Sequence, residues 1–235
     1  MKIIKKNILI QAGRARIPGH FCHPPGKGSF PAVVVFHGSD GYKPNHGGVA
    51  HRLAREGFAA LAPAWFGEDP ARAHWDEIRA EDILRIFDWL ENEVSVNAGL
   101  LGLIGFSRGG GLALVSASLI PNIRAVVNYF GLTSWKGGLE EFPHLPLRKE
   151  DPLHFAREVS CPILSFHGDQ DTVVPIENTY LLDHACRRFG VKHDSVIYPG
   201  VNHSFVWPGD KYNQKAHLDS WDRALRFLRQ NLFLS

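Results

Sequence analysis

A single serine lies among glycines in the stretch LIGFSRGGG, residues 103–111. The pattern Gly105-x-Ser107-x-Gly109 joins two apolar runs, which is typical of a sharp turn from a buried strand into a helix. The backbone is crowded at such a turn, so small residues are favoured two positions before and after the serine. The turn would lift the Ser107 hydroxyl above the end of the strand, where it could act as a nucleophile.

A nucleophilic serine needs a general base and an acid that orients the base, and after this kind of turn the acid precedes the histidine along the chain. The segment GDQDTVVP follows the apolar run CPILSFH and places two carboxylates, Asp169 and Asp171, in a loop at a strand end. The segment PGVNHSF places His203 in a loop after the next strand. We predict Ser107, Asp171 and His203 as nucleophile, acid and base. Asp169 is the competing acid, and we expect it to cap the turn.

Backbone N–H groups are the donors that an acyl-transfer oxyanion requires. The loop FHGSDGY, residues 36–42, follows the first buried strand, and its glycines allow N–H groups to point inward. We expect the N–H groups of Ser39 and Arg108 to form the oxyanion hole. His37 is expected to be a structural residue, buried beside the nucleophile.

Alternating strands and helices are predicted around these loops. Short apolar and β-branched runs predict a hairpin over 2–10 and 14–22, then buried strands at 31–36, 58–63, 100–106, 123–130, 161–167 and 194–198. Apolar periodicity and breakers predict helices at 46–56, 76–93, 108–119, 177–189 and 214–230. This alternation predicts an α/β fold with a mostly parallel central sheet and helices on both faces. In such sheets ligands bind at the carboxyl ends of the strands.

Composition and charge limit the function classes. The 235 residues are 44% hydrophobic and 21% charged, with a formal net charge of +2, which predicts neither nucleic-acid nor membrane binding. The N-terminus lacks the pattern of a signal peptide, so we expect a cytoplasmic protein. The cysteines form no CxxC pair and are expected to be free, buried thiols: Cys22, Cys161 and Cys186. His46 and His51 lack metal-ligand spacing and companion ligands, so no metal and no cofactor is expected.

One domain is expected over residues 1–235. Within it, the irregular segment 131–158 is rich in Gly, Pro and charge, and would form either a short cap over the site or an excursion over the surface. Four aromatic side chains, most of them following strand ends, are expected to line the pocket for the acyl group: Trp65, Phe66, Trp135 and Trp207.

Five motifs spread over nearly the whole chain carry a family resemblance: VVVFHGSDG (33–41), REGFAALAP (55–63), LIGFSRGGG (103–111), HGDQDTVVP (167–175) and NHSF (202–205). With them the chain resembles an α/β-hydrolase of the dienelactone hydrolase family. The resemblance implies a serine hydrolase that cleaves an ester, lactone or thioester through an acyl-enzyme, with Ser107, Asp171 and His203 as its triad. The implied partner is a small acyl substrate, and the enzyme would be a monomer or a homodimer.

Several positions depart from the pattern of that family. Its namesake enzymes have a cysteine nucleophile where this chain has Ser107, and a glutamate in the oxyanion loop where it has Gly38. Two arginines that hold the substrate carboxylate in those enzymes are replaced here by Glu68 and Trp207. We therefore expect a neutral substrate rather than a carboxylated lactone. The segment 100–119 also resembles acyl-CoA thioesterases and acyltransferases, which is the alternative function, and a non-catalytic ligand-binding protein is a further one.

Overall fold

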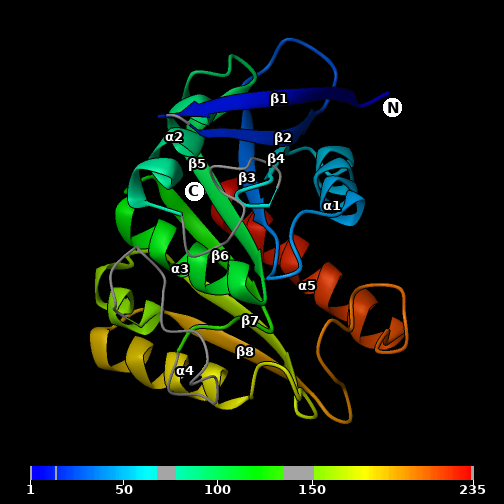
Figure 1. Ribbon diagram of the computed structural model, residues 1–235, viewed down its shortest axis with the longest axis vertical. Helices are drawn as coiled ribbons and strands as arrows, with labels where there is room; N and C mark the ends of the chain where they lie inside the picture. The colour runs from blue at the N-terminus through cyan, green and yellow to red at the C-terminus, as the bar shows by residue number, and fades with distance from the viewer. Residues whose placement is uncertain (1, 14, 68–77, 135–150, 234–235) are drawn as a thin grey trace.

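An eight-stranded sheet forms the centre of the molecule (Figure 1). The computed structural model describes residues 2–13, 15–67, 78–134 and 151–233. Its elements follow along the chain as β1 (Ile4–Ala12), β2 (Ala15–His23), β3 (Phe30–Phe36), α1 (Pro44–Arg55), β4 (Ala59–Pro63), α2 (Ala80–Glu91), β5 (Val96–Phe106), α3 (Arg108–Leu119), β6 (Ile123–Tyr129), the 3₁₀ segment η3 (Pro152–Glu158), β7 (Ile163–Gly168), α4 (Glu177–Phe189), β8 (His193–Tyr198) and α5 (Gln214–Leu232).

The sheet has the strand order β1-β2-β4-β3-β5-β6-β7-β8. β1 and β2 form an antiparallel hairpin, and β2 pairs antiparallel with β4. From β4 to β8 in that order, every neighbouring pair is parallel. The predicted α/β fold with a mostly parallel sheet is therefore confirmed. The carboxyl ends of β3, β5, β6, β7 and β8 meet at one edge of the sheet, where loops can combine into a site.

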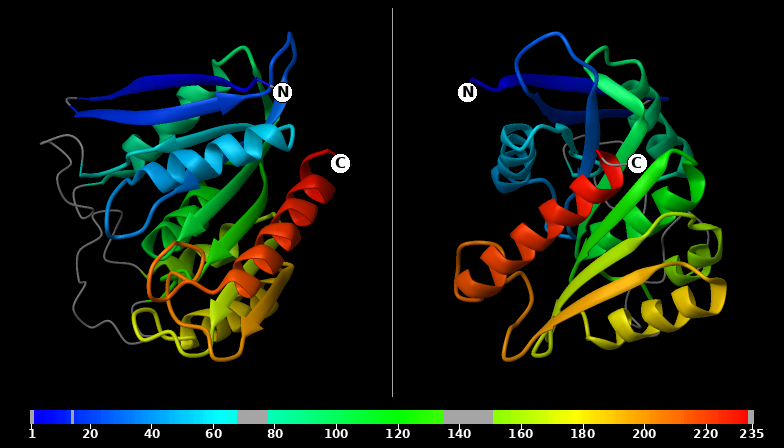
Figure 2. Two further views of the ribbon diagram at one scale, coloured as in Figure 1. Left: turned by 90° about the vertical axis from the view of Figure 1, so that its right-hand side faces the viewer. Right: turned by 180° about the vertical axis from the view of Figure 1, so that it is seen from behind.

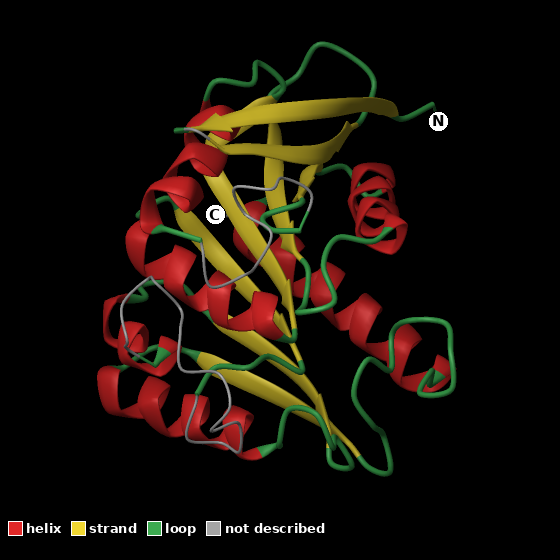
Figure 3. Cartoon of the chain, in the orientation of Figure 1, coloured by secondary structure: helices red, strands yellow, loops and turns green. Residues whose placement is uncertain are grey.

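Helices cover both faces of the sheet. Figure 2 turns the face with α1 and α5 toward the viewer, and Figure 3 shows α2, α3 and α4 on the opposite side from α1. The core accordingly divides into two clusters: one includes Ile86 of α2 and Leu114 of α3, and the other includes Leu53 of α1 and Leu228 of α5. β3 and β4 are buried along almost their whole length because both of their faces are covered.

The segment 131–158 is described only at its two ends. Residues 131–134 continue from β6, and η3 packs against α3 and α4. Residues 135–150, with Trp135, lie outside the described residues, so a cap over the site stays a prediction. The single domain over 1–235 stays a prediction as well. Among the described helices, none is both long enough and apolar enough to cross a membrane.

Candidate active site

Ser107 occupies the turn between β5 and α3 with an unusual backbone conformation. Its φ is 52° and its ψ is −118°, a combination that a residue with a Cβ adopts only under strain. The neighbouring backbone holds it there, because the Ser107 N–H donates to Tyr129 O at 2.9 Å and the Ser107 carbonyl accepts from Leu132 N at 2.9 Å. The strand-end turn therefore presents the hydroxyl at the carboxyl edge of the sheet.

Glycine is required on both sides of this turn. A Cβ added at Gly105 would lie 2.2 Å from the Gly109 carbonyl oxygen, and a Cβ at Gly109 would lie 2.5 Å from the Phe36 carbonyl oxygen. These separations are far below any van der Waals contact, so α3 reaches its close position on β3 and β5 only because both residues lack a side chain. The Gly-x-Ser-x-Gly spacing thus has a direct steric cause.

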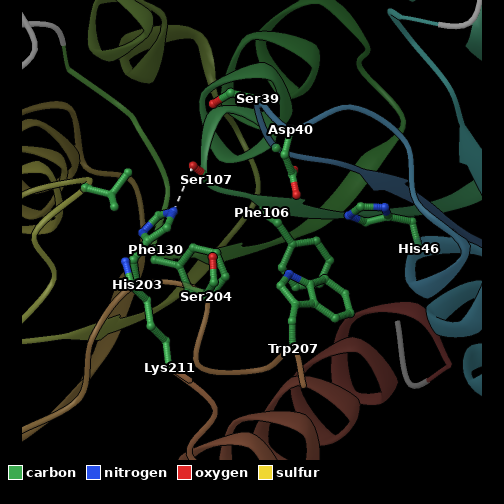
Figure 4. Close-up of a pocket in the computed structure, with 12 residues that line it drawn as sticks. Ser39, Asp40, His46, Phe106, Ser107, Phe130, His203, Ser204, Trp207 and Lys211 are labelled. Carbon is green, nitrogen blue, oxygen red and sulfur yellow. Dashed lines mark hydrogen bonds between the residues drawn. The ribbon is translucent and has the colours of Figure 1, made fainter. Parts of the chain in front are cut away.

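The three residues predicted to act together form one hydrogen-bonded chain. His203 Nε2 lies 3.2 Å from Ser107 Oγ (Figure 4), and His203 Nδ1 lies 2.6 Å from Asp171 Oδ2. With Nδ1 protonated, His203 donates to the carboxylate and its Nε2 accepts from the Ser107 hydroxyl. Phe130 packs edge-on against the imidazole at a centroid distance of 4.7 Å, which limits rotation of the ring.

Asp171 is held as a buried carboxylate. Its Oδ1 accepts from the N–H groups of Val173 at 2.9 Å and Val174 at 2.8 Å, while Oδ2 faces His203. Burial by itself would raise the pKa of Asp171, but the hydrogen bonds from His167 and His203 outweigh it and hold the pKa well below its usual range. The carboxylate is therefore ionised at neutral pH and can stabilise an imidazolium.

The competing carboxylate has a different partner. Asp169 Oδ1 accepts from the Gly200 N–H at 2.7 Å, which ties the loop after β7 to the loop after β8. Asp169 thus links two loops instead of capping its own turn as we expected, and the N–H groups of that turn donate to Asp171, which is also the carboxylate on His203.

His167 is a member of the site that sequence reasoning missed. It is the penultimate residue of β7 and its side chain is fully buried, with Nε2 3.2 Å from Asp171 Oδ2 and 2.9 Å from the Val174 carbonyl oxygen. Its Nδ1 lies 2.7 Å from Thr179 Oγ1. Because Nε2 faces two oxygen acceptors, it carries the proton, and Thr179 donates to Nδ1. A histidine near the end of a buried strand that leads into GDQD was the available signal.

The two predicted oxyanion donors flank Ser107. Ser39 lines the same cavity as Ser107 (Figure 4), and Arg108 follows Ser107 as the first residue of α3. The first N–H groups of a helix have no acceptor within that helix, so they can serve an oxyanion. Gly38 brings the loop 36–42 against Ser107: a Cβ at this position would lie 3.2 Å from Ser107 Cβ.

Gly38→Ala is expected to lower kcat about tenfold, because the added methyl group would displace Ser107 by a few tenths of an ångström and a displacement of about 1 Å can cost roughly 10²-fold. Steady-state kinetics on a simple ester would measure the effect. Gly48→Ala in α1 is the matched control, since a Cβ there meets nothing within 4 Å. An unchanged kcat in Gly38→Ala would contradict the crowding at Ser107.

A cavity of about 310 Å³ opens beside Ser107 and His203. Phe106, Phe130 and Trp207 supply aromatic walls, and the polar lining includes Ser39, Asp40, His46, Ser204 and Lys211 (Figure 4). This volume suits a small molecule. Sequence reasoning missed the positions of His46 and Lys211, of which Lys211 adds an exposed basic side chain to the lining.

The predicted pocket aromatics divide into three cases. Trp207 lines the cavity, whereas Trp135 lies outside the described residues. Trp65 and Phe66 are 1% and 6% exposed and pack on His37, with ring centroids 5.1 and 4.9 Å from the imidazole. The Trp65 indole N–H donates to the His37 carbonyl at 3.2 Å, which turns the ring under the oxyanion loop. The expectation that these two residues line the pocket is therefore corrected for the cavity as described: they support the loop instead.

The cysteines at 22, 161 and 186 are buried and free, and burial raises the pKa of Cys161 and Cys186 to about 12. Within the part of the chain that the structure describes, no group of three or more His, Cys, Asp or Glu side chains is placed to hold a metal ion.

Comparison with known proteins places this geometry in a family. The sequence model of the "Dienelactone hydrolase family" matches residues 17–232. A "Putative carboxymethylenebutenolidase" from Synechocystis sp. is 26% identical over 96% of each chain. A "Probable 2-oxo-3-(5-oxofuran-2-ylidene)propanoate lactonase" from Bradyrhizobium sp. is also 26% identical, over 94% of this chain and 91% of that relative.

Solved structures agree in fold. The crystal structure of a putative dienelactone hydrolase from Klebsiella pneumoniae superposes with a TM-score of 0.83 at 21% identity, covering 98% of this chain and 100% of that one. A dienelactone hydrolase-like promiscuous phosphotriesterase from metagenomic libraries gives a TM-score of 0.79 at 23% identity, over 97% and 98% of the two chains. Because the family match spans nearly the whole sequence, this chain belongs to the dienelactone hydrolase family of the α/β-hydrolase superfamily and is a hydrolase that acts on ester bonds.

Proposed function

We propose that the protein is a serine hydrolase that cleaves a small carboxylic ester or lactone through an acyl-enzyme on Ser107. The observation that carries the proposal is the hydrogen-bonded chain Ser107–His203–Asp171 at the wall of a cavity of about 310 Å³. The names of the curated relatives, a butenolidase and a lactonase, support a substrate with an ester bond.

Acylation begins when His203 Nε2 removes the Ser107 proton as Oγ attacks the acyl carbon. The carbonyl oxygen becomes an oxyanion between the N–H groups of Ser39 and Arg108. The bond from the acyl carbon to the alcohol oxygen then breaks, and the His203 imidazolium protonates the leaving oxygen. In a lactone, that hydroxyl remains tethered to the acyl group.

Deacylation repeats the same proton transfers with water in place of the serine. His203 removes a proton from water as the water oxygen attacks the acyl carbon, and it returns a proton to Ser107 Oγ as the acyl bond breaks. Asp171 keeps the Nδ1-protonated tautomer throughout and stabilises the imidazolium. The alternative of a non-catalytic ligand-binding protein does not account for the hydrogen bonds that join Ser107, His203 and Asp171.

Acyl-CoA thioester hydrolysis, or transfer to an acceptor other than water, is the alternative that uses the same residues. Both begin with the same acylation of Ser107, so the acceptor and the leaving group distinguish them. We further propose a cytoplasmic enzyme that needs no cofactor, binds neither nucleic acid nor membrane, and acts as a monomer or a homodimer on a small acyl molecule.

Trapping the acyl-enzyme tests the proposal. The protein is mixed with p-nitrophenyl acetate, a γ-lactone or an acetyl thioester, quenched in acid and analysed by intact mass and peptide mapping. We expect acylation confined to Ser107, with turnover of the oxygen ester or lactone. Acylation elsewhere, or no hydrolysis of any of the three, would overturn the proposed function, and turnover of the thioester alone would favour the alternative.

Lys211→Met is expected to have little effect on the choice between a neutral ester and its ω-carboxylate analogue. The Lys211 side chain is exposed, and an exposed ion pair contributes about 0–1 kcal/mol, or up to about fivefold in kcat/KM. Wild-type protein should still prefer the neutral ester. Lys215→Met, at the exposed start of α5, is the control. A carboxylate preference of tenfold or more that disappears in Lys211→Met would identify Lys211 as an anion anchor.

A further inference from the structure

We propose that His46 and Asp40 form a hydroxyl-binding pair at the α1 end of the cavity, and that the natural substrate carries a free hydroxyl group to which this pair binds. The inference deepens the proposed ester hydrolysis, on which it rests for the presence of a substrate. It concerns the chemical class of that substrate and two residues that the catalytic steps do not use.

The backbone at the start of α1 determines which nitrogen of His46 carries the proton. Lys43 precedes the helix, and its N–H lies 3.0 Å from His46 Nδ1. The Lys43 carbonyl already accepts the His46 backbone N–H at 2.9 Å. His46 Nδ1 also lies 3.2 Å from the Lys43 carbonyl oxygen, but that oxygen already accepts the His46 backbone N–H, whereas the Lys43 N–H has Nδ1 as its acceptor. We therefore assign the Nδ1 lone pair to the Lys43 N–H, which places the proton of the neutral ring on Nε2.

The His46 ring is neutral and fixed. Its residue is 3% exposed, and burial lowers its pKa to about 4, against a smaller opposing effect of Asp40. Aromatic neighbours hold the ring: Trp207 packs edge-on at 5.2 Å between centroids and Phe106 lies at 6.1 Å. At neutral pH the side chain therefore offers the cavity one donor, Nε2–H, in a constant orientation.

Asp40 supplies the matching acceptor. Its carboxylate lines the same cavity and forms an ion pair with Lys43. Figure 4 shows the Asp40 carboxylate and the His46 imidazole pointing toward one another across the end of the cavity. None of the hydrogen bonds among the described residues joins Asp40 to the His46 ring, and both residues line the cavity, so a ligand bound there can contact both.

A hydroxyl group is the simplest function that satisfies both residues. Its oxygen accepts from His46 Nε2–H, and its hydrogen is donated to the Asp40 carboxylate. A carboxylate would be repelled by Asp40, an ammonium group has no lone pair for His46, and a carbonyl oxygen would bring Asp40 no donor beyond Lys43. The negative charge of Asp40 and the single donor Nε2–H of His46 therefore favour an alcohol group at this end of the cavity.

Matched pairs of esters test the inference: γ-butyrolactone against its α-hydroxy derivative, ethyl propionate against ethyl lactate, and ethyl butyrate against ethyl 3-hydroxybutyrate. A hydrogen bond that involves a charged group is worth enough to change an equilibrium by about 10- to 100-fold. We expect wild-type kcat/KM to favour the hydroxylated member of at least one pair by about that factor, mainly through KM.

The variants His46→Phe and Asp40→Asn assign that preference to the pair. His46→Phe keeps the aromatic packing on Trp207 and removes the Nε2–H donor, so the preference should fall to about one. Asp40→Asn should reduce it severalfold. The ratio for two substrates is independent of the folded fraction, so loss of the His46 contact with Lys43 does not alter it. His51→Phe, on the same helix and outside this cavity, should keep the wild-type ratio.

Two results would overturn the inference while leaving the proposed function intact: ester turnover with no hydroxyl preference above threefold in any pair, or a preference that persists in both variants. Failure of every ester and lactone to acylate Ser107 would instead overturn the proposed function, and the inference with it.

Discussion

Replacing Ser107 by alanine is expected to lower ester turnover by about 10³-fold or more without unfolding the protein. In the proposed mechanism Ser107 is one member of a set that acts as a unit, so its loss would remove most of the covalent advantage. Folding should be retained because alanine has the same Cβ as serine, and the positive φ of 52° therefore strains both residues to a similar degree. The wild-type hydroxyl contributes one hydrogen bond to His203 at 3.2 Å, and little stability depends on it.

The measurement combines kcat/KM on p-nitrophenyl acetate with a thermal unfolding curve. Ser118→Ala is the matched control, because that hydroxyl bonds to the carbonyl of Val115 within α3. We expect Ser118→Ala to keep wild-type turnover and both variants to unfold near the wild-type temperature. If Ser107→Ala retained most of the hydrolytic rate, the acyl-enzyme on Ser107 would be excluded.

Much of this architecture follows from local patterns. Parallel strands bring their carboxyl ends to a common edge, so a serine after β5, an aspartate after β7 and a histidine after β8 can be assigned to one place from the strand pattern alone. The short buried runs and the glycine spacing around the Ser107 turn reflect steric limits that act within a few residues. These limits are visible in the sequence because they exclude almost every other residue type.

The parts that escaped prediction depend on contacts between distant segments. The strand predicted at 100–106 begins earlier, at Val96, because Val96 and Asn97 pair with Phe30 and Pro31 before a register shift. Trp65 turns toward the oxyanion loop because its indole N–H finds the His37 carbonyl. Lys211 lies in the loop between β8 and α5, and no periodic sequence pattern predicts the path of that loop to the cavity. Side-chain direction in loops is thus set by tertiary hydrogen bonds rather than by local sequence.

Asp169 and Asp171 show both what the local sequence predicts and what depends on contacts between distant segments. Strand order alone placed Asp169 and Asp171 in one loop and left them as alternatives. Hydrogen bonding distinguishes them, since Asp169 accepts from Gly200 N–H whereas Asp171 accepts from the His203 ring. This difference predicts that Asp171→Asn loses more turnover than Asp169→Asn.

Asp171→Asn is expected to lower turnover by about 10³–10⁴-fold, while Asp169→Asn should cost only a modest factor. The N–H groups of Val173 and Val174 keep an oxygen acceptor at the Oδ1 position, so the new amide NH₂ takes the place of Oδ2. That NH₂ group donates to His203 Nδ1, which shifts the ring proton to Nε2. The imidazole then cannot accept the Ser107 proton. Asparagine at 169 retains an oxygen for Gly200 N–H and leaves the ring tautomer unchanged.

Acid unfolding gives the same two variants an independent readout. The folded-state pKa of Asp171 lies below its unfolded value, so the carboxylate stabilises the fold at pH values above the ordinary carboxyl pKa. This contribution is lost as the pH falls below that value toward the folded pKa. Asp171→Asn should therefore be less stable than wild type at pH 7, and the difference should shrink on acidification. Asp169→Asn serves as the control in both measurements. A larger loss of turnover in Asp169→Asn than in Asp171→Asn would assign the acid to Asp169.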